Sequence, residues 1–204
     1  MYYLWYYKIR SWKGDVLIMK TIYLVTGAAG HLGSTIVRQL LALGKRVRAL
    51  VLPTERNIQD LEGTELFRGD ICQKDTLVPF FKPEPETERK VIHCAGIVSI
   101  ASKFQKKVYE VNVNGTGNIL DACIRTEVSK LVYVSSVHAI PELPKNQTIT
   151  EIRHFSPDKV VGMYAKTKAE ATQLVLDAAE QGLNASVVHP SGICGPFDRG
   201  RGHI

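Results

Sequence analysis

The stretch TGAAGHLG, residues 26–33, decides the fold of this 204-residue chain. It follows a short apolar run and precedes a segment with helical spacing. Gly27 permits a tight turn, Gly30 lets the backbone approach a pyrophosphate with no Cβ in the way, and Gly33 lets the helix pack closely on the strand. A helix N-terminus then offers free amide groups and a positive dipole end to the anion. This stretch therefore predicts a dinucleotide-binding loop.

Strand-like and helix-like segments alternate from residue 21 onward. The predicted strands are 22–25, 47–52, 66–68, 91–94, 131–134 and 185–189, and the predicted helices are 32–43, 108–125 and 164–181. Such alternation implies right-handed βαβ units and a parallel sheet. Six strands complete a dinucleotide-binding sheet, so the predicted fold class is α/β with a doubly wound parallel sheet. Residues 139–163 show the least regular pattern, and we expect a loop there beside the active site.

Residues 1–18 (MYYLWYYKIRSWKGDVLI) differ from the rest because they are aromatic and basic without a clear period. They lack the apolar region and the small-residue cleavage site of a signal peptide. An interfacial membrane anchor is a weaker hypothesis, since the apolar residues do not gather on one helical face. Met19 begins a more regular segment. We interpret 1–18 as an extension outside the domain, from a start codon assigned too early, and 19–204 as one dinucleotide-binding domain.

Charge and cysteine content exclude several classes of protein. Half of the formal net charge of +6 lies in residues 1–20, so the domain carries no basic stripe and we predict no nucleic-acid partner. No apolar run approaches the ~20 residues that cross a bilayer. The four cysteines are scattered and form no CxxC pair, which favours small buried thiols in a reduced cytoplasm. We expect a cytoplasmic chain with neither a metal site nor a membrane partner.

Two segments carry residue types suited to acid–base chemistry. Tyr164 and Lys168 stand four residues apart at the start of a predicted helix, so they share one face. A tyrosine has a pKa of about 10, and a nearby ammonium group favours the phenolate and lowers that pKa. Ser135 and Ser136 end the predicted strand 131–134, at the sheet edge where ligands of such folds bind. A hydroxyl there can hydrogen-bond a substrate oxygen.

With these motifs, residues 19–204 resemble the extended branch of the short-chain dehydrogenase/reductase superfamily, whose fingerprint is TGxxGxxG. The resemblance implies a Rossmann fold that binds NAD(P), with a Ser136, Tyr164 and Lys168 triad; Ser135 is the weaker choice for the serine. It also implies that Tyr164 exchanges a proton with the substrate oxygen, that Ser136 orients that oxygen, and that Lys168 lowers the pKa of Tyr164 and holds the nicotinamide ribose. Extended members continue into a smaller substrate-binding lobe, which is largely absent from this sequence.

Further segments match the family's cofactor-binding positions. GDI follows the third strand and holds the Asp that meets the adenine ring in the family, and HCAG ends the fourth strand and resembles the segment that runs along the cofactor backbone. NVNGT resembles the family's NVxGT. HPSGICGP resembles RPxxxYGP, with His189 in place of Arg and Cys194 in place of Tyr. The predicted cofactor-binding residues are Gly27, Ala29, Gly30, His31, Leu32, Gly33, Asp70, Ile71, Cys94, Ala95, Gly96, Asn112, Tyr164, Lys168, Pro190, Ser191, Gly192 and Ile193.

The choice between NAD and NADP depends on the end of the second strand. NAD enzymes of this class place an acid there for the ribose hydroxyls, and the position is Val51. NADP-preferring relatives often have Arg next, and here it is Leu52. The remaining candidates for a 2′-phosphate are Arg38, Arg48 and Arg56. The missing acid favours NADP slightly.

Three functions fit these residues. The first is hydride transfer between nicotinamide and a secondary alcohol or ketone, since VIHCAGIVSI and VNVNGTGNILDAC look most like the hydroxysteroid dehydrogenase and dihydroflavonol reductase-like members. The second is a nucleotide-sugar epimerase or dehydratase with retained NAD; Val137 and His138 after Ser136 argue against the dehydratase. The third is a non-catalytic NAD(P)-binding fragment. The predicted partner is a small-molecule substrate, with a homodimer as a further hypothesis.

Overall fold

A computed structural model describes residues 19–144 and 146–196. The prediction about residues 1–18 lies outside the described residues. The elements are β1 (Lys20–Thr26), α1 (His31–Ala42), β2 (Arg46–Val51), β3 (Glu65–Arg68), α2 (Lys74–Leu77), β4 (Thr87–His93), α3 (Lys106–Tyr109), α4 (Thr116–Arg125), β5 (Lys130–Val134), α5 (Met163–Glu180) and β6 (Ala185–Val188). Within this part of the chain, no helix has the length and apolarity to cross a membrane.

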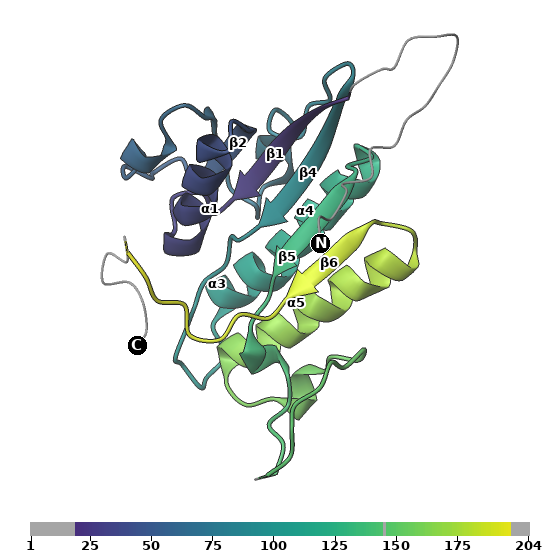
Figure 1. Ribbon diagram of the computed structural model, residues 1–204. Helices are drawn as coiled ribbons and strands as arrows, with labels where there is room; N and C mark the ends of the chain where they lie inside the picture. Colours follow the sequence, from purple (N-terminus) through teal and green to yellow (C-terminus); the bar gives the residue numbers. More distant parts are fainter. Residues whose placement is uncertain (1–18, 145, 197–204) are drawn as a thin grey trace, which may run out of the picture.

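The six strands form one sheet in the order β3-β2-β1-β4-β5-β6, and every neighbouring pair is parallel. This order has the reversal between β1 and β4 that defines a doubly wound, Rossmann-type sheet. The carboxyl ends of β1 and β4 point to the same edge, where α1 also begins (Figure 1). The predicted fold class is confirmed.

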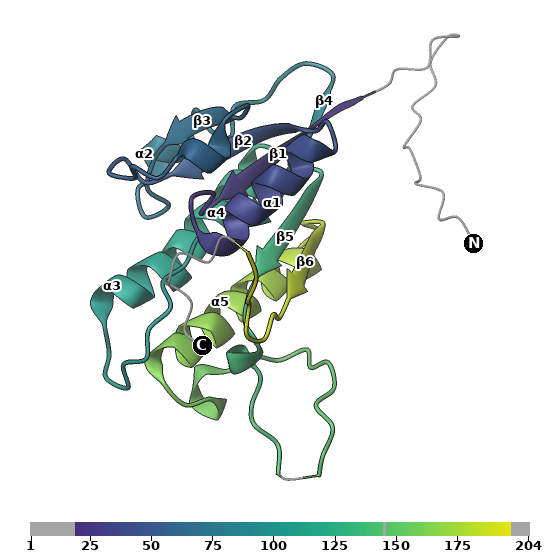
Figure 2. The ribbon, with the colours of Figure 1, turned by 60° about the vertical axis from the view of Figure 1, so that its left-hand side comes forward.

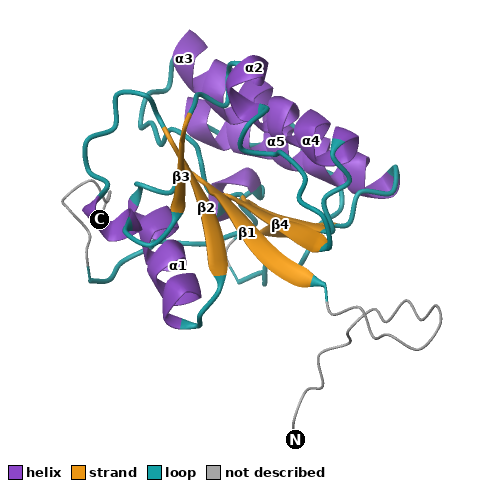
Figure 3. Ribbon diagram, turned by 90° about the horizontal axis from the view of Figure 1, so that it is seen from above, coloured by secondary structure: helices purple, strands orange, loops and turns teal. Residues whose placement is uncertain are grey.

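Helices cover both faces of the sheet. Figure 3 shows α1 on one face and α2, α3, α4 and α5 on the other. Successive side chains of a strand point to opposite faces, so β1 contributes side chains to two hydrophobic cores. Ile22 and Leu24 belong to the core under α4 and α5, and Val25 belongs to the core under α1. The burial of both faces explains why β1 contains a continuous apolar run at residues 22–25.

A third, smaller core fixes the connection from β5 to α5. Ala139, Phe155 and Val160 from that connection pack with Ala165 and Ala169 on α5. The described part of the connection between these anchor points projects from the body of the domain (Figure 2). The prediction of a loop over 139–163 is correct for most of its length, and the structure adds short 3-10 turns at Val137–Ala139 and Pro157–Lys159.

The predicted helix over 108–125 is wrong in one respect. The chain turns helical at Lys106, widens into a π-helical segment at Glu110–Gly115, and returns to α-helix at Thr116. A π-segment adds a residue to the turn and is common at functional sites. Here its Asn112 is only 1 % exposed and is turned into the protein. The 3.6-residue period of the sequence gives no sign of this insertion, because the apolar positions on either side keep their spacing.

A buried imidazole joins the central strands at the edge where the order reverses. His93, which is fully buried, contacts Thr26 Oγ1 at 2.7 Å through Nδ1 and Thr116 Oγ1 at 3.1 Å through Nε2. Thr116 donates its own proton to the carbonyl of Asn112 at 2.7 Å, so it accepts from Nε2. Nδ1 therefore accepts from Thr26, whose oxygen in turn accepts from the amide of Ala95 at 3.3 Å. Every member of this chain is satisfied with a neutral imidazole.

Burial, with a smaller contribution from the charge of Lys168, lowers the pKa of His93 from 6.5 to about 3. Between those two values the unfolded chain binds a proton that the folded chain does not, so the stability present above pH 6.5 is lost as the pH falls. We expect the free energy of unfolding to fall by about 2 kcal/mol from pH 7 to pH 5 through this group. Urea titrations at half-unit pH steps measure it.

The matched variants are His93→Gln, in the core, and His154→Gln, at an exposed position. The dependence on pH should flatten in the first and remain in the second. An equal dependence in all three proteins would contradict the assignment to His93.

Candidate active site

The loop after β1 is held by direct contact between backbones. Gly27 has a φ of 64°, and a Cβ there would lie 2.7 Å from the amide nitrogen of Ala95. A Cβ on Gly33 would overlap the carbonyl oxygen of Gly27. No other residue fits either position without moving the backbone. The two glycines hold the start of α1 against the ends of β1 and β4.

The N-terminus of α1 is open to a ligand. Gly30 is exposed and caps α1 without any side-chain hydrogen bond, and no acidic residue lies in the first turn. The helical hydrogen bonds begin with the amide of Ser34, which donates to Gly30 at 2.8 Å. The amides of His31 and Leu32, which precede it, point out of the helix end. The arrangement fits an anion such as the pyrophosphate of a dinucleotide.

The segment after β4 is attached to the π-helical segment through Asn112. Its amide oxygen accepts from the nitrogen of Ile97 at 2.7 Å, and its amide nitrogen donates to the carbonyl of Ile97 at 2.9 Å and to Thr167 Oγ1 at 3.1 Å. A Cβ on Gly96 would lie 3.3 Å from the Asn112 oxygen and 3.5 Å from Lys168 Nζ. The bare backbone of Gly96 therefore leaves a space beside the amine of Lys168.

Lys168 reaches this space from the interior and is only 5 % exposed. Its Nζ donates to the carbonyl of Val134 at 2.8 Å and to the hydroxyl of Tyr133 at 3.3 Å, and it lies over the Tyr133 ring. Burial lowers the pKa of this amine to about 8. An ammonium has three donors, so one remains for a ligand on the Gly96 side. This geometry suits a ribose hydroxyl.

The two serines after β5 have different surroundings. Ser135 is buried, and its hydroxyl lies 2.6 Å from Thr172 Oγ1, which donates to the carbonyl of Lys168 at 2.7 Å. It therefore joins β5 to α5. Ser136 is buried as well, and its hydroxyl faces the turn at Val137–Ala139 and helps to lower the pKa of the Tyr164 phenol. The geometry supports the choice of Ser136 over Ser135.

Tyr164 is the second residue of α5 and is partly buried. Burial raises its pKa, and the hydrogen bond with Ser136 offsets part of that rise. The amine of Lys168 is bonded to Val134 and Tyr133, and its effect on the pKa of Tyr164 stays a prediction. The i and i+4 positions do share a helix face. The long lysine side chain, however, extends past the phenol into the interior.

His189, which stands where the family motif has arginine, packs against the segment after β5. Its ring stacks on Phe155 at 5.2 Å between centroids with 9° between planes, and Nδ1 lies 3.0 Å from the carbonyl oxygen of Ser136. The amide of Val137 donates to the carbonyl of Pro190 at 3.0 Å. The segment after β6 is thus tied to the segment after β5. Beyond it, Ser191, Gly192 and Ile193 are exposed at the same edge.

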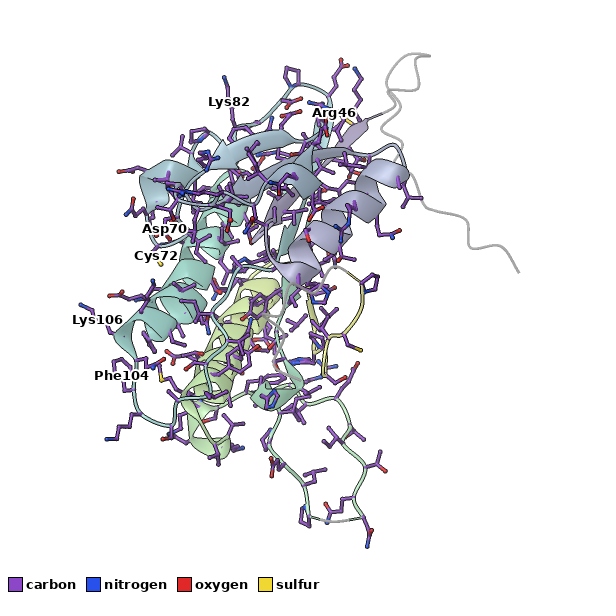
Figure 4. The ribbon with its side chains drawn as sticks, turned by 90° about the vertical axis from the view of Figure 1, so that its left-hand side faces the viewer. Arg46, Asp70, Cys72, Lys82, Phe104 and Lys106 are labelled. Atoms are coloured by element: carbon purple, nitrogen blue, oxygen red, sulfur yellow. The ribbon has the colours of Figure 1, made fainter. Side chains whose placement is uncertain are left out.

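The remaining predicted cofactor positions lie after β3. The amide of Cys72 donates to the carboxylate of Asp70 at 2.9 Å, and Figure 4 shows these two side chains close together beyond the strand. Ile71 is buried against Gly115, and its carbonyl accepts from Asn118 at 2.8 Å. Asp70 is therefore presented near the end of the sheet on a fixed turn.

Among the three arginines proposed for a 2′-phosphate, Arg48 is excluded. It is 4 % exposed and bonded to Glu65, Glu84 and two backbone carbonyls, so it holds the sheet together. Arg38 forms an ion pair with Asp60 at 3.1 Å. Arg56 is exposed on the loop after β2. It is the candidate of the three with an exposed side chain.

Two other features of the described chain do not compete with this site. A groove of about 620 Å³ between α2 and α4, lined by Lys74, Leu77 and Arg125 among others, lies on the outer surface of the helices, away from the strand ends. No cluster of potential metal ligands occurs in the described ranges. The four cysteines are unpaired. The interpretation of all of them as buried thiols is correct for Cys123, whereas Cys72 and Cys94 are half-buried and Cys194 is exposed.

Sequence reasoning missed two histidines at this site. His138 contacts the hydroxyl of Ser136, and His189 contacts its carbonyl. It also missed Tyr133 as a partner of Lys168. The available signals were the position of His138 two residues after the serine and the presence of Tyr133 within the same strand. Neither signal shows which way the side chain points.

Comparison with known proteins places the chain in a family. A model of the "3-beta hydroxysteroid dehydrogenase/isomerase family" matches residues 24–201, so the chain belongs to this family. The resemblance to extended short-chain dehydrogenases/reductases is confirmed. A putative dihydroflavonol 4-reductase of Synechocystis sp. is 33% identical over 89% of this chain and 52% of its own length. The 3 beta-hydroxysteroid dehydrogenase type 7 of Mus musculus is 32% identical over 85% and 50%.

A solved structure shows the same fold with a cofactor. The UDP-glucose 4-epimerase of Thermus thermophilus in complex with NAD superposes with a TM-score of 0.73 at 28% identity, over 89% of this chain and 58% of that one. The chain spans about half the length of the curated relatives it matches. The relatives are named as dehydrogenases and reductases, and the structure compared is an epimerase.

Gly30→Val should block dinucleotide binding. A Cβ at Gly30 would meet only the carbonyl of Gly27, at 3.3 Å, so the variant can fold while its side chain fills the ligand space. Titration with NADPH and NADH, followed by nicotinamide fluorescence, should show saturable binding in the wild type and none in the variant.

The control is Gly117→Ala, at a helical position where a Cβ would have no neighbour within 4 Å. It should bind as the wild type does. Normal affinity in a folded Gly30→Val protein would refute the phosphate-loop assignment.

Proposed function

We propose that this chain is the cofactor-binding and catalytic part of an NAD(P)-dependent oxidoreductase that transfers hydride between nicotinamide and a secondary alcohol or ketone. The observation that carries the proposal is the convergence of Ser136, Tyr164 and Lys168 at the sheet edge that also holds the open N-terminus of α1. The named activities of its relatives support the same class of reaction.

The described residues fit a dinucleotide. The glycine contacts at Gly27 and Gly33 shape a cradle, the amides of α1 face it, and Gly96 leaves room beside Lys168. When bound, the nicotinamide ring supplies the hydride chemistry. The protein positions the ring, and Lys168 would hold the ribose with its remaining donor.

The proton chemistry is assigned to the chain's own side chains. Tyr164 would give a proton to the substrate oxygen in reduction and take one in oxidation, and Ser136 would orient that oxygen. Ser136 follows the carboxyl end of β5 and Tyr164 lies in the first turn of α5, where the backbone is fixed by the core at Ala139 and Ala165. Fixed geometry is what a hydride transfer needs, because the reacting atoms must approach to about 3–3.5 Å.

Tyr164→Phe tests the proton transfer. The variant keeps the ring and loses the hydroxyl, so turnover should fall by at least ~100-fold while the affinity for NADPH stays within a few-fold. Turnover is measured with NADP+ and NAD+ against a panel of secondary alcohols, and in reverse with the matching ketones. Unchanged turnover in this variant would contradict the assignment of the proton transfer to Tyr164.

For the cofactor we infer a preference for NADP, supported by the missing acid at Val51 and by the exposed guanidinium of Arg56. Arg56→Ala should lower the affinity for NADPH about tenfold, since a guanidinium–phosphate contact is lost, and leave the affinity for NADH unchanged. Arg153→Ala, at another exposed position, is the control. An equal effect on both cofactors would assign Arg56 a general role.

A second candidate is epimerisation with a retained NAD, which the similarity to the epimerase complex favours. The two functions differ in how the cofactor behaves. An oxidoreductase exchanges its cofactor in each turnover and an epimerase keeps it. Release of nucleotide on denaturing the freshly purified chain, with no loss on dialysis of the native chain, would favour the epimerase.

A further inference from the structure

The amine of Lys168 is buried and has no carboxylate beside it. Lys168 takes part in none of the ion pairs found in the described ranges. A buried charge without a counter-ion is costly unless neighbouring dipoles compensate for it. Two neighbouring residues at the end of β5 provide such dipoles, through the carbonyl of Val134 at 2.8 Å and the hydroxyl of Tyr133 at 3.3 Å.

Tyr133 contacts the amine with both its hydroxyl and its ring. The Nζ atom of Lys168 lies over the Tyr133 ring, 4.8 Å from the centroid. A cation at this distance is attracted by the negative face of the ring, and more strongly in a desolvated site. Burial raises the pKa of the Tyr133 phenol, so the phenol stays neutral. Tyr133 therefore stabilises the ammonium through a hydroxyl dipole and a ring face, without becoming a counter-ion.

The strand register fixes the position of Tyr133. This residue is 1 % exposed and pairs with His93 on the neighbouring strand β4. The two rings lie 5.5 Å apart with 32° between planes, and His93 is itself bonded to Thr26 and Thr116. Tyr133 also belongs to the core that packs under α4 and α5. Its hydroxyl cannot move away from Lys168 without opening that core.

The positions of the two acceptors determine where the remaining donor of Lys168 points. An ammonium has three N–H groups at tetrahedral angles, and Val134 and Tyr133 accept two of them. The Nζ atom makes no other hydrogen bond within the part of the chain that the structure describes. A Cβ on Gly96 would lie 3.5 Å from Nζ, so the bare backbone there leaves space for a ligand that takes the third donor.

We propose that Tyr133 is a positioning residue that keeps the amine of Lys168 charged and directs its third N–H group to the cofactor in the space beside Gly96. The inference rests on the proposed function, in which Lys168 holds the nicotinamide ribose. In this role Tyr133 acts through Lys168 and not through contact with the reacting atoms. A neutral amine has two N–H groups, and Val134 and Tyr133 accept both, so loss of the charge removes the donor for the ligand.

The other titratable groups that face Lys168 stay neutral while its amine titrates. Burial lowers the pKa of this amine to about 8. On β4, burial lowers the pKa of His93 to about 3 and raises that of the Cys94 thiol to about 12. Burial also raises the pKa values of the Tyr133 and Tyr164 phenols above their usual value of 10. A titration of this site near pH 8 therefore reports on Lys168.

The first test needs neither substrate nor cofactor. In NMR spectra of the chain labelled with 13C- and 15N-lysine, the Lys168 signal, assigned with Lys168→Gln, should titrate with a midpoint of about 8. Tyr133→Phe keeps the ring and removes the hydroxyl, so the midpoint should fall by about one pH unit, the effect expected for a lost hydrogen bond to a charged group. Tyr133→Leu, which also removes the ring, should lower the midpoint further.

The control is Tyr23→Phe, at a tyrosine on β1 that packs against the core under α1. It should leave the midpoint of Lys168 where it is in the wild type. An equal midpoint in Tyr133→Phe and the wild type would overturn the proposal.

The second test links the amine to the cofactor. NADPH affinity is followed by nicotinamide fluorescence from pH 7 to pH 9, where the phosphate groups keep a nearly constant charge. Wild-type affinity should fall about tenfold over this range as Lys168 loses its proton. Tyr133→Phe should bind within about twofold of the wild type at pH 7 and about tenfold more weakly at pH 9, because its amine deprotonates about one unit earlier. An equal loss of affinity at every pH would make Tyr133 a merely structural residue and overturn the proposal.

Failure of the proposed function gives a different result from failure of the role of Tyr133. A folded wild-type chain that binds no NADPH would refute the proposed function and, with it, the direction of Lys168 to a cofactor. The lysine titration would still decide whether Tyr133 keeps the amine charged. A chain that binds NADPH with the expected dependence on pH, but turns over no secondary alcohol or ketone, would refute hydride transfer and support the role of Tyr133.

Discussion

The architecture depends on a place where three pieces of backbone meet without side chains between them. Gly27 lies against Ala95 at the end of β4, and Gly33 lies against Gly27 from the first turn of α1. This contact brings the N-terminus of a helix to the point where the strand order reverses, the position at which a doubly wound sheet can hold a ligand. A Cβ at Gly27 would push the loop away from Ala95, and a Cβ at Gly33 would push the helix away from Gly27.

Next to that contact, a network of hydrogen-bonded side chains connects the glycine loop to the π-helical segment. Thr26, the residue before Gly27, shares its hydroxyl with His93, and His93 shares Thr116 with the π-helical segment. Unsatisfied polar groups in such a dry place would cost several kcal/mol, so the network admits one protonation state and one arrangement. We expect this network to be rigid and to hold the backbone near the amine of Lys168 in place.

The carboxyl end of β5 carries the serine to which we assign a part in the proposed proton chemistry. Both serines are buried, but Ser135 faces α5 while Ser136 faces the turn that carries His138, because successive residues of an extended chain point to opposite sides. The same strand end thus holds one serine that joins β5 to α5 and one serine proposed to contact the substrate. The stacked pair of His189 and Phe155 closes the same strand end from the far side.

Local patterns in the sequence determined the alternation of strands and helices, the parallel sheet and the glycine loop, because period and turn chemistry are properties of neighbouring residues. The Ser136, Tyr164 and Lys168 set was predicted through the resemblance to a family. Only the tertiary structure decided side-chain direction. It sent Lys168 past Tyr164 into the interior, buried Arg48 in ion pairs and brought His138 onto Ser136. These outcomes depend on which partners, far apart in sequence, satisfy a buried charge or hydroxyl, and no local pattern contains that information.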